Sequence, residues 1–217
     1  MQVIAIAGEM DYTVNYANAL LYAGKKPRVT VCPEEISWCD GLILPGGGDI
    51  APSFWGEENT GSRGVNPMLD SAQAVMLQRA IEAGIPVLGI CKGHQLINVY
   101  FGGTIIQHIR SADHHIGREG KDNVHLIQNC PGSLLEQVYG STMMVNSWHH
   151  QGVGQVPDCL KVSACWSDGA ECVIEGLEHV YLPILSVQWH PERMSFGRRR
   201  GDTADAAPLW EVFFALG

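Results

Sequence analysis

The first half of the chain alternates short apolar runs with helical patterns, and this alternation constrains the fold more than any other feature. The apolar runs span residues 3–7, 27–31, 41–44 and 86–90, and the helical patterns span residues 12–23 and 68–83. Apolar runs of this length, bounded by turn residues, are typical of strands buried on both faces. A strand, a helix and a further strand in succession form right-handed βαβ units. The first half therefore predicts a parallel sheet covered by helices on both faces.

The second half has a different pattern. Its strand-like runs span residues 124–127, 142–146, 160–164, 172–177 and 184–188, with one helical pattern at 133–139, a polar loop at 195–207 and a last helix at 208–216. Short strands separated by turn residues favour antiparallel pairing. We therefore expect an α/β fold whose mainly parallel sheet is flanked by helices and carries additional antiparallel strands in the second half. The 217 residues show no internal repeat, so a single domain over residues 1–217 is expected.

Composition excludes several classes of partner. The net charge of −9 argues against nucleic acid and against an anionic membrane surface, because both require a basic face. The seven cysteines are an odd number without a C-x-x-C pair, which suits a reducing compartment. No apolar stretch reaches the roughly 18 residues that span a bilayer. These observations predict a cytoplasmic protein. The pair His114-His115 is expected in a solvated loop, and the absence of suitably spaced Cys and His partners disfavours a zinc site.

One cysteine occupies a position suited to a nucleophile. Cys91 stands between two glycines in Gly89-Ile90-Cys91-Lys92-Gly93, after an apolar run and before a helical stretch. At a tight turn between a strand and a helix, a side chain is pushed out of the sheet, and small neighbours relieve crowding of the strained backbone. The N-terminus of the following helix favours a thiolate over a thiol. The motif alone fits an activated nucleophile and a buried structural cysteine equally well.

A histidine and a glutamate follow the run at 184–188. In extended geometry residues two apart share a face, so Glu192 could hold the second ring nitrogen of His190. His190 would then deprotonate Cys91 and later protonate a leaving amine, while Glu192 fixes the tautomer. The alternative is a histidine at a strand end beside an unrelated solvated glutamate.

The third element is the glycine loop Pro45-Gly46-Gly47-Gly48-Asp49, at the carboxyl end of a predicted strand. Glycines let backbone N–H groups approach a substrate closely, as an oxyanion hole requires, and the N–H of Lys92 would supply the other donor. A phosphate-cradling loop and a plain connector are the alternatives, although no Lys-Ser/Thr follows the glycines as in a P-loop. All three elements fall at carboxyl ends of predicted strands, where open α/β sheets bind ligands.

Taken together, these motifs resemble those of class I glutamine amidotransferases. The resemblance rests on Gly-Ile-Cys-Lys-Gly-His-Gln at 89–95, the glycine loop and Gln-Trp-His-Pro-Glu at 188–192. The segment 46–57, the run Asn-Ser-Trp-His-His-Gln at 146–151 and Ile-Glu-Gly at 174–176 are similar to the γ-glutamyl hydrolase branch, which includes γ-glutamyl-γ-aminobutyrate hydrolase. The similarity covers nearly the whole chain.

The resemblance implies a flavodoxin-like fold and hydrolysis of a γ-glutamyl amide bond through a cysteine thioester, without metal or organic cofactor. It implies Cys91, His190 and Glu192 as the catalytic triad, Gly47 or Gly48 with Lys92 as the oxyanion hole, and Gln95, His149, His150 and Gln151 as substrate contacts. The expected partner is a small γ-glutamyl substrate. The sequence leaves open whether the chain forms a homodimer. The alternatives are a glutaminase subunit that supplies ammonia to a separate synthetase, and a non-catalytic binding module of the same fold.

The chain departs from the family pattern at several positions. Leu69-Asp70-Ser71-Ala72-Gln73 stands where Arg-Asp-x-x-Glu is common. Lys92 stands where arginine is common, and His94 stands where methionine is common in this branch.

Overall fold

One continuous nine-stranded sheet forms the centre of the molecule. The computed structural model describes residues 1–217. The strands follow the order β2-β1-β3-β4-β11-β10-β9-β6-β7. The first five are parallel: β2 (Lys26–Thr30), β1 (Val3–Ala7), β3 (Gly41–Leu44), β4 (Val87–Ile90) and β11 (Ile184–Val187). The other four pair in antiparallel fashion: β10 (Cys172–His179), β9 (Leu160–Ser167), β6 (Asn123–Asn129) and β7 (Thr142–Ser147). The predicted fold class is confirmed.

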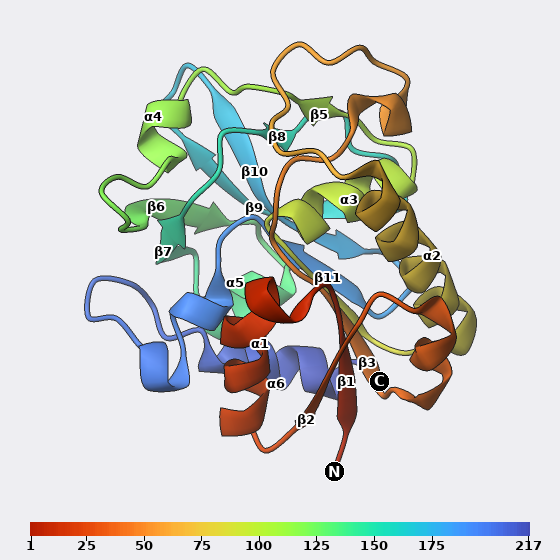
Figure 1. Ribbon diagram of the computed structural model, residues 1–217. Helices are drawn as coiled ribbons and strands as arrows, with labels where there is room; N and C mark the ends of the chain where they lie inside the picture. Colours follow the sequence, from red (N-terminus) through yellow and green to blue (C-terminus); the bar gives the residue numbers. More distant parts are fainter.

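Helices cover both faces of the parallel half. The α-helices are α1 (Met10–Tyr22), α2 (Pro67–Ala83), α3 (Lys92–Tyr100), α4 (Ala112–His115), α5 (Leu134–Tyr139) and α6 (Ala207–Ala215). The 3-10 helices are η1 (Pro33–Trp38), η2 (Pro52–Trp55), η3 (Pro191–Arg193) and η4 (Phe196–Arg198). Helices α1 and α6 lie on one side of the sheet, and α2 and α3 on the other (Figure 1).

Alternate residues of each buried strand pack into two hydrophobic cores, one on each face of the sheet. In β1, Ile4 and Ile6 belong to the core under α1 and α6, whereas Ala5 and Ala7 belong to the core under α2 and α3. Successive strand residues point to opposite faces, so a strand with a helix layer on each side must be apolar throughout. This is why the parallel strands read as continuous apolar runs.

Local signals fix the helix that precedes β4. Asn66 caps α2 by accepting a hydrogen bond from the N–H of Leu69 at 3.2 Å, and Pro67 occupies its first position. Gly84 ends the helix with a φ of 67°, a left-handed conformation that glycine adopts without strain. Helix α2 starts at residue 67, one residue before the predicted range of 68–83, and ends at residue 83 as predicted.

Some elements are short or irregular and escaped the sequence patterns. A two-stranded sheet pairs β5 (Ile105–Ile106) with β8 (Gly152–Val153). The predicted solvated loop around residues 114–115 is wrong for His115, which ends α4 and is fully buried, while His114 is exposed. The segment 195–207 contains η4. None of the helices combines the length and the apolar character that a membrane-spanning segment requires.

Candidate active site

Cys91 occupies the sharp turn between β4 and α3. Its φ of 53° and ψ of −104° lie outside the regions that non-glycine residues commonly adopt, and such strain is concentrated at functional sites. The flanking glycines are sterically required. A Cβ on Gly89 would lie 2.7 Å from the carbonyl oxygen of Gly93, and a Cβ on Gly93 would overlap the carbonyl oxygen of Leu44. The turn therefore has the geometry that its sequence predicted.

His190 and Glu192 form a buried pair beside Cys91. The Nδ1 atom of His190 lies 2.8 Å from Oε1 of Glu192, and the side chains are 5% and 0% exposed. Burial by itself lowers the pKa of His190, but the charges of Glu192 and Cys91 and hydrogen bonds to both raise that pKa to about 10. The ring is therefore held as an imidazolium at neutral pH, with Glu192 on one nitrogen and Cys91 on its other side.

The route by which Glu192 reaches His190 differs from the sequence argument. Strand β11 ends at Val187, and Glu192 lies in the 3-10 helix η3 that starts at Pro191. The two residues are therefore brought together by a tight turn rather than by sharing one face of a strand.

Two residues that the sequence argument did not assign hold this pair in place. The Asn146 side chain accepts a hydrogen bond from the backbone N–H of His190 at 2.9 Å and donates one to its carbonyl oxygen at 3.1 Å. The Arg193 Nε atom lies 3.3 Å from Oε1 of Glu192. Asn146 begins the family-like run at 146–151, so its position in that run was the available signal.

The three glycines of the loop after β3 have different surroundings. Gly46 packs against His190 and Cys91, because a Cβ there would lie 2.9 Å from Cε1 of His190 and 3.3 Å from Cβ of Cys91. Its N–H donates to Oη of Tyr16 at 2.9 Å. Burial and the charge of Glu192 raise the pKa of Tyr16 well above its usual value, so this phenol stays neutral. Tyr16 was not predicted as a site residue.

Of the two glycines expected in the oxyanion hole, the structure places only Gly47 on the cavities that contain Cys91. The backbone N–H of Gly47 donates no hydrogen bond within the protein. Gly48 instead packs against the backbone of Gly64, where a Cβ would overlap its carbonyl oxygen. The close approach of two chain segments explains why Gly48 is small.

The Lys92 backbone and side chain have separate environments. Lys92 is the first residue of α3, so its N–H has no acceptor within the helix. Its Nζ forms a buried ion pair with Asp70 at 2.6 Å and donates to Oε1 of Gln73 at 2.8 Å. The departures from the family pattern at 73 and 92 are thus in direct contact. His94, another departure, is fully buried against Oγ of Ser186 at 2.9 Å.

A cavity of about 300 Å³ extends from Cys91 and gathers the expected substrate contacts. Gln95, His149, His150 and Gln151 all line it, as do Gly47, Asp49, Arg63, Lys92, Ile116 and Trp148. The structure therefore brings together residues from the glycine loop, α3 and the segment after β7.

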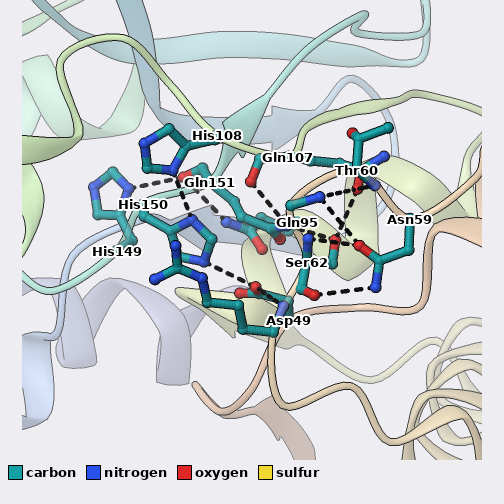
Figure 2. A network of polar contacts seen from close by, with 12 residues as sticks. Asp49, Asn59, Thr60, Ser62, Gln95, Gln107, His108, His149, His150 and Gln151 are labelled. Atoms are coloured by element: carbon teal, nitrogen blue, oxygen red, sulfur yellow. Dashed lines mark hydrogen bonds and ion pairs between the residues drawn. The ribbon is translucent and has the colours of Figure 1, made fainter.

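Polar contacts fix the wall of this cavity, as Figure 2 shows. Nε2 of His150 lies 2.9 Å from Oδ2 of Asp49, and the side-chain amide of Gln151 donates to Oγ of Ser62 at 2.7 Å. The amide of Gln95 donates to Oε1 of Gln188 at 3.1 Å. Gln151 is thereby committed to holding the loop at 59–63, whereas His150 and Asp49 stay 15% exposed as a polar pair at the cavity.

The sheet topology explains why these segments meet. Strands β3, β4 and β11 are adjacent and parallel. Their carboxyl ends carry the glycine loop, Cys91 and the segment that leads to His190. Three segments separated by more than forty residues in sequence therefore converge at one edge of the sheet.

Fold and site together define a protein of the class I glutamine amidotransferase type. A model of the Peptidase C26 family matches residues 17–192, and the chain belongs to this family. Two solved structures share the fold. One is a "putative gmp synthase subunit a protein" from Thermoplasma acidophilum, with a TM-score of 0.73, 19% identity and coverage of 100% of this chain and 94% of the other. The other is the glutaminase domain of Trypanosoma brucei CTPS, with a TM-score of 0.68, 16% identity and coverage of 99% and 94%.

Sequence relatives carry related names. The "Putative glutamine amidotransferase Rv2859c" of Mycobacterium tuberculosis is 37% identical over 160 residues, which cover 70% of this chain and 50% of the relative. The chain thus spans half the length of that relative. The γ-glutamyl-γ-aminobutyrate hydrolase PuuD of Escherichia coli is 28% identical over 198 residues, which cover 82% of this chain and 76% of PuuD.

Proposed function

We propose that the protein hydrolyses γ-glutamyl amide bonds through a thioester on Cys91. The Cys91 thiolate attacks the amide carbon, and the N–H groups of Gly47 and Lys92 stabilise the resulting oxyanion. The His190 imidazolium gives its proton to the leaving amine as the tetrahedral intermediate collapses. The neutral ring then takes a proton from water, which attacks the thioester and releases glutamate. Glu192 holds Nδ1 of His190 throughout.

One observation carries this proposal. A strained cysteine stands at a strand-to-helix turn, next to a buried His190–Glu192 pair in which the imidazole and carboxylate are 2.8 Å apart. A buried ion pair of this kind needs a reason to persist, because burying two charges costs free energy that their attraction does not always recover. Holding an imidazolium beside a thiolate supplies that reason.

The surface beside the site favours an amine leaving group that carries an anion. A second cavity contains Cys91, His190, Asn15 and Arg193, and it adjoins a basic hollow through the last two residues. Five of the eight residues lining that hollow are cationic: Lys121, Arg193, Arg198, Arg199 and Arg200. Arg193 pairs with Asp122 and Glu192, Arg199 with Asp205 and Arg200 with Asp202, so Lys121 and Arg198 carry the unpaired positive charge. In a chain of net charge −9, such a local excess of positive charge attracts a carboxylate. A γ-glutamyl amine with a carboxylate, such as γ-glutamyl-γ-aminobutyrate, fits this arrangement.

The test is a hydrolysis screen of the purified chain. The panel holds γ-glutamyl-γ-aminobutyrate, a neutral γ-glutamyl alkylamine, γ-glutamyl dipeptides and glutamine, with released glutamate as the readout. We expect turnover of the γ-glutamyl amines and none by Cys91→Ala, with unchanged folding by circular dichroism. Hydrolysis that persists in Cys91→Ala would contradict the proposal.

Two results would favour the other functions instead. Weak glutamine hydrolysis that rises only when a synthetase is added would indicate an ammonia-supplying subunit. No turnover, with Cys91 no more reactive toward iodoacetamide than the other six cysteines, would indicate a binding module.

A further inference from the structure

A buried cluster of three histidines and one glutamate lies beside the candidate active site and has no role in the proposed reaction. We call His115, His125, His149 and Glu175 the histidine cluster. They come from the end of α4, from β6, from the segment after β7 and from β10. His115 and Glu175 are fully buried, and the side chains of His125 and His149 are 8% and 3% exposed.

The three histidines point at one carboxylate oxygen. Oε1 of Glu175 lies 3.5 Å from Nδ1 of His115, 3.3 Å from Nε2 of His125 and 3.6 Å from Nε2 of His149. Hydrogen bonds between a charged ring and a carboxylate are shorter, at about 2.7–2.9 Å. None of these contacts has hydrogen-bond geometry, so both oxygens of Glu175 and five ring nitrogens of the cluster are buried without a partner. Buried polar atoms in such number are rare in folded proteins.

A hydrogen bond to the other ring nitrogen of His149 shows which nitrogen of this ring carries the hydrogen. Nδ1 of His149 lies 2.8 Å from the carbonyl oxygen of Gln151. A carbonyl only accepts, so Nδ1 carries a hydrogen. In the neutral ring Nε2 then directs a lone pair at Oε1 of Glu175, and two lone pairs face each other. A backbone carbonyl that fixes the tautomer in this way is the usual outer contact of a metal-bound histidine.

We propose that His115, His149 and Glu175 bind one divalent cation of the zinc class. The ligand atoms of these three residues all lie within 4.8 Å of one another. Zinc bonds of about 2.0–2.2 Å in a tetrahedron place neighbouring ligand atoms about 3.3–3.6 Å apart. The distances of 3.5 Å and 3.6 Å from Oε1 of Glu175 to His115 and His149 fall in this range. A water completes the tetrahedron. His125 lies outside the mutual set, with its Nε2 atom 3.3 Å from the same Oε1 of Glu175.

The ion would have a structural role. It would tie α4 and β10 to His149, which lines the cavity next to Cys91. Trp166 packs edge to face against the cluster, with its ring centroid 4.8 Å from that of His115, and helps close it from solvent. The cation thus fixes a wall of the substrate cavity and does not contact the reacting atoms.

The test measures metal binding and not turnover, so it is independent of the proposed function. The protein is stripped with a chelator and titrated with Zn²⁺ and with Co²⁺, whose visible absorption reports tetrahedral coordination. We expect one equivalent per chain, a rise in Tm, and a cobalt spectrum without the near-ultraviolet sulfur charge-transfer band. His115→Ala and Glu175→Gln should weaken binding by about 100-fold or more, since outer-contact changes alone cost 10- to 100-fold.

His114→Ala is the matched control, because His114 is the exposed neighbour of His115 on α4 and should keep full affinity. If the His115 and Glu175 variants fail to fold, the cobalt spectrum of the unaltered protein decides the question. No stoichiometric binding and an unchanged Tm would overturn the proposal. So would a sulfur band that disappears when Cys91 is alkylated, or full affinity in folded His115→Ala and Glu175→Gln.

Discussion

Replacing Gly46 by alanine tests how closely the glycine loop fits the reactive groups. The backbone of Gly46 does not have a left-handed φ, so alanine adds no conformational strain. The added methyl would lie 2.9 Å from Cε1 of His190, 3.0 Å from Oη of Tyr16 and 3.3 Å from Cβ of Cys91. Ordinary contacts of a Cβ are 3.4–4 Å, so His190 and Tyr16 must move by about half an ångström.

The geometry gives the size of the effect. Misplacement of a reacting group by about 1 Å costs roughly 100-fold in rate, so we expect kcat/KM to fall by about 10- to 100-fold. That loss corresponds to about 1.4–2.7 kcal/mol of transition-state stabilisation. Overpacking costs about 1–3 kcal/mol of folding free energy, so Tm should also drop by several degrees.

The assay compares kcat/KM, the rate of Cys91 alkylation and Tm between the unaltered chain and Gly46→Ala. Gly201→Ala is the control, because a methyl there meets nothing within 4 Å and the backbone φ is ordinary. A folded Gly46→Ala protein with kcat/KM within twofold of the unaltered chain would refute the reasoning.

Other predictions concern the charges around the site. Because the pKa of His190 is raised from 6.5 to about 10 by Glu192 and Cys91 against its burial, its protonation stabilises the fold fully below pH 6.5 and is lost as the pH rises to about 10. Urea unfolding across this window should show a steeper loss of stability for the unaltered chain than for Glu192→Gln. Lys92→Met leaves Asp70 buried without its partner at 2.6 Å and should cost about 3–5 kcal/mol in chemical denaturation, while Lys92→Met with Asp70→Leu recovers much of that loss. Arg198→Ala should raise KM for γ-glutamyl-γ-aminobutyrate several-fold, in a salt-dependent manner, and leave KM for a neutral γ-glutamyl alkylamine unchanged.

The departures from the family pattern at positions 73 and 92 are in contact, and together they keep the start of α3 in place beside Cys91. Lys92 replaces a common arginine and reaches Asp70 and Gln73 on α2. Gln73 in turn donates to the carbonyl oxygen of Ala7 at 2.7 Å. The lysine therefore anchors the start of α3 to α2 and β1, and its backbone N–H keeps its place beside Cys91.

Much of the fold followed from local patterns. The parallel strands were predicted to within a residue or so, because a strand buried on both faces must be apolar throughout and its ends are marked by glycine and proline. The two-residue strands β5 and β8 were missed, since two residues carry no period. The short helix α4 was missed because its four residues span about one helical turn, too few to show a helical repeat.

The sequence by itself predicted the turn at Cys91 from its flanking glycines, and a Cβ on Gly89 would indeed crowd the nearby carbonyl of Gly93. Gly93 is restricted by Leu44 on the neighbouring strand β3, a contact that only the tertiary structure supplies. The sequence also predicted His190 and Glu192 as neighbours, two residues apart on one segment. Only the tertiary structure separated the roles of Gly46, Gly47 and Gly48, which contact His190, the cavity and Gly64 respectively. It alone gathered His115, His149 and Glu175 around one point. Their spacing of 34 and 26 residues follows no local period, and packing of α4 and β10 against the segment after β7 brings them together.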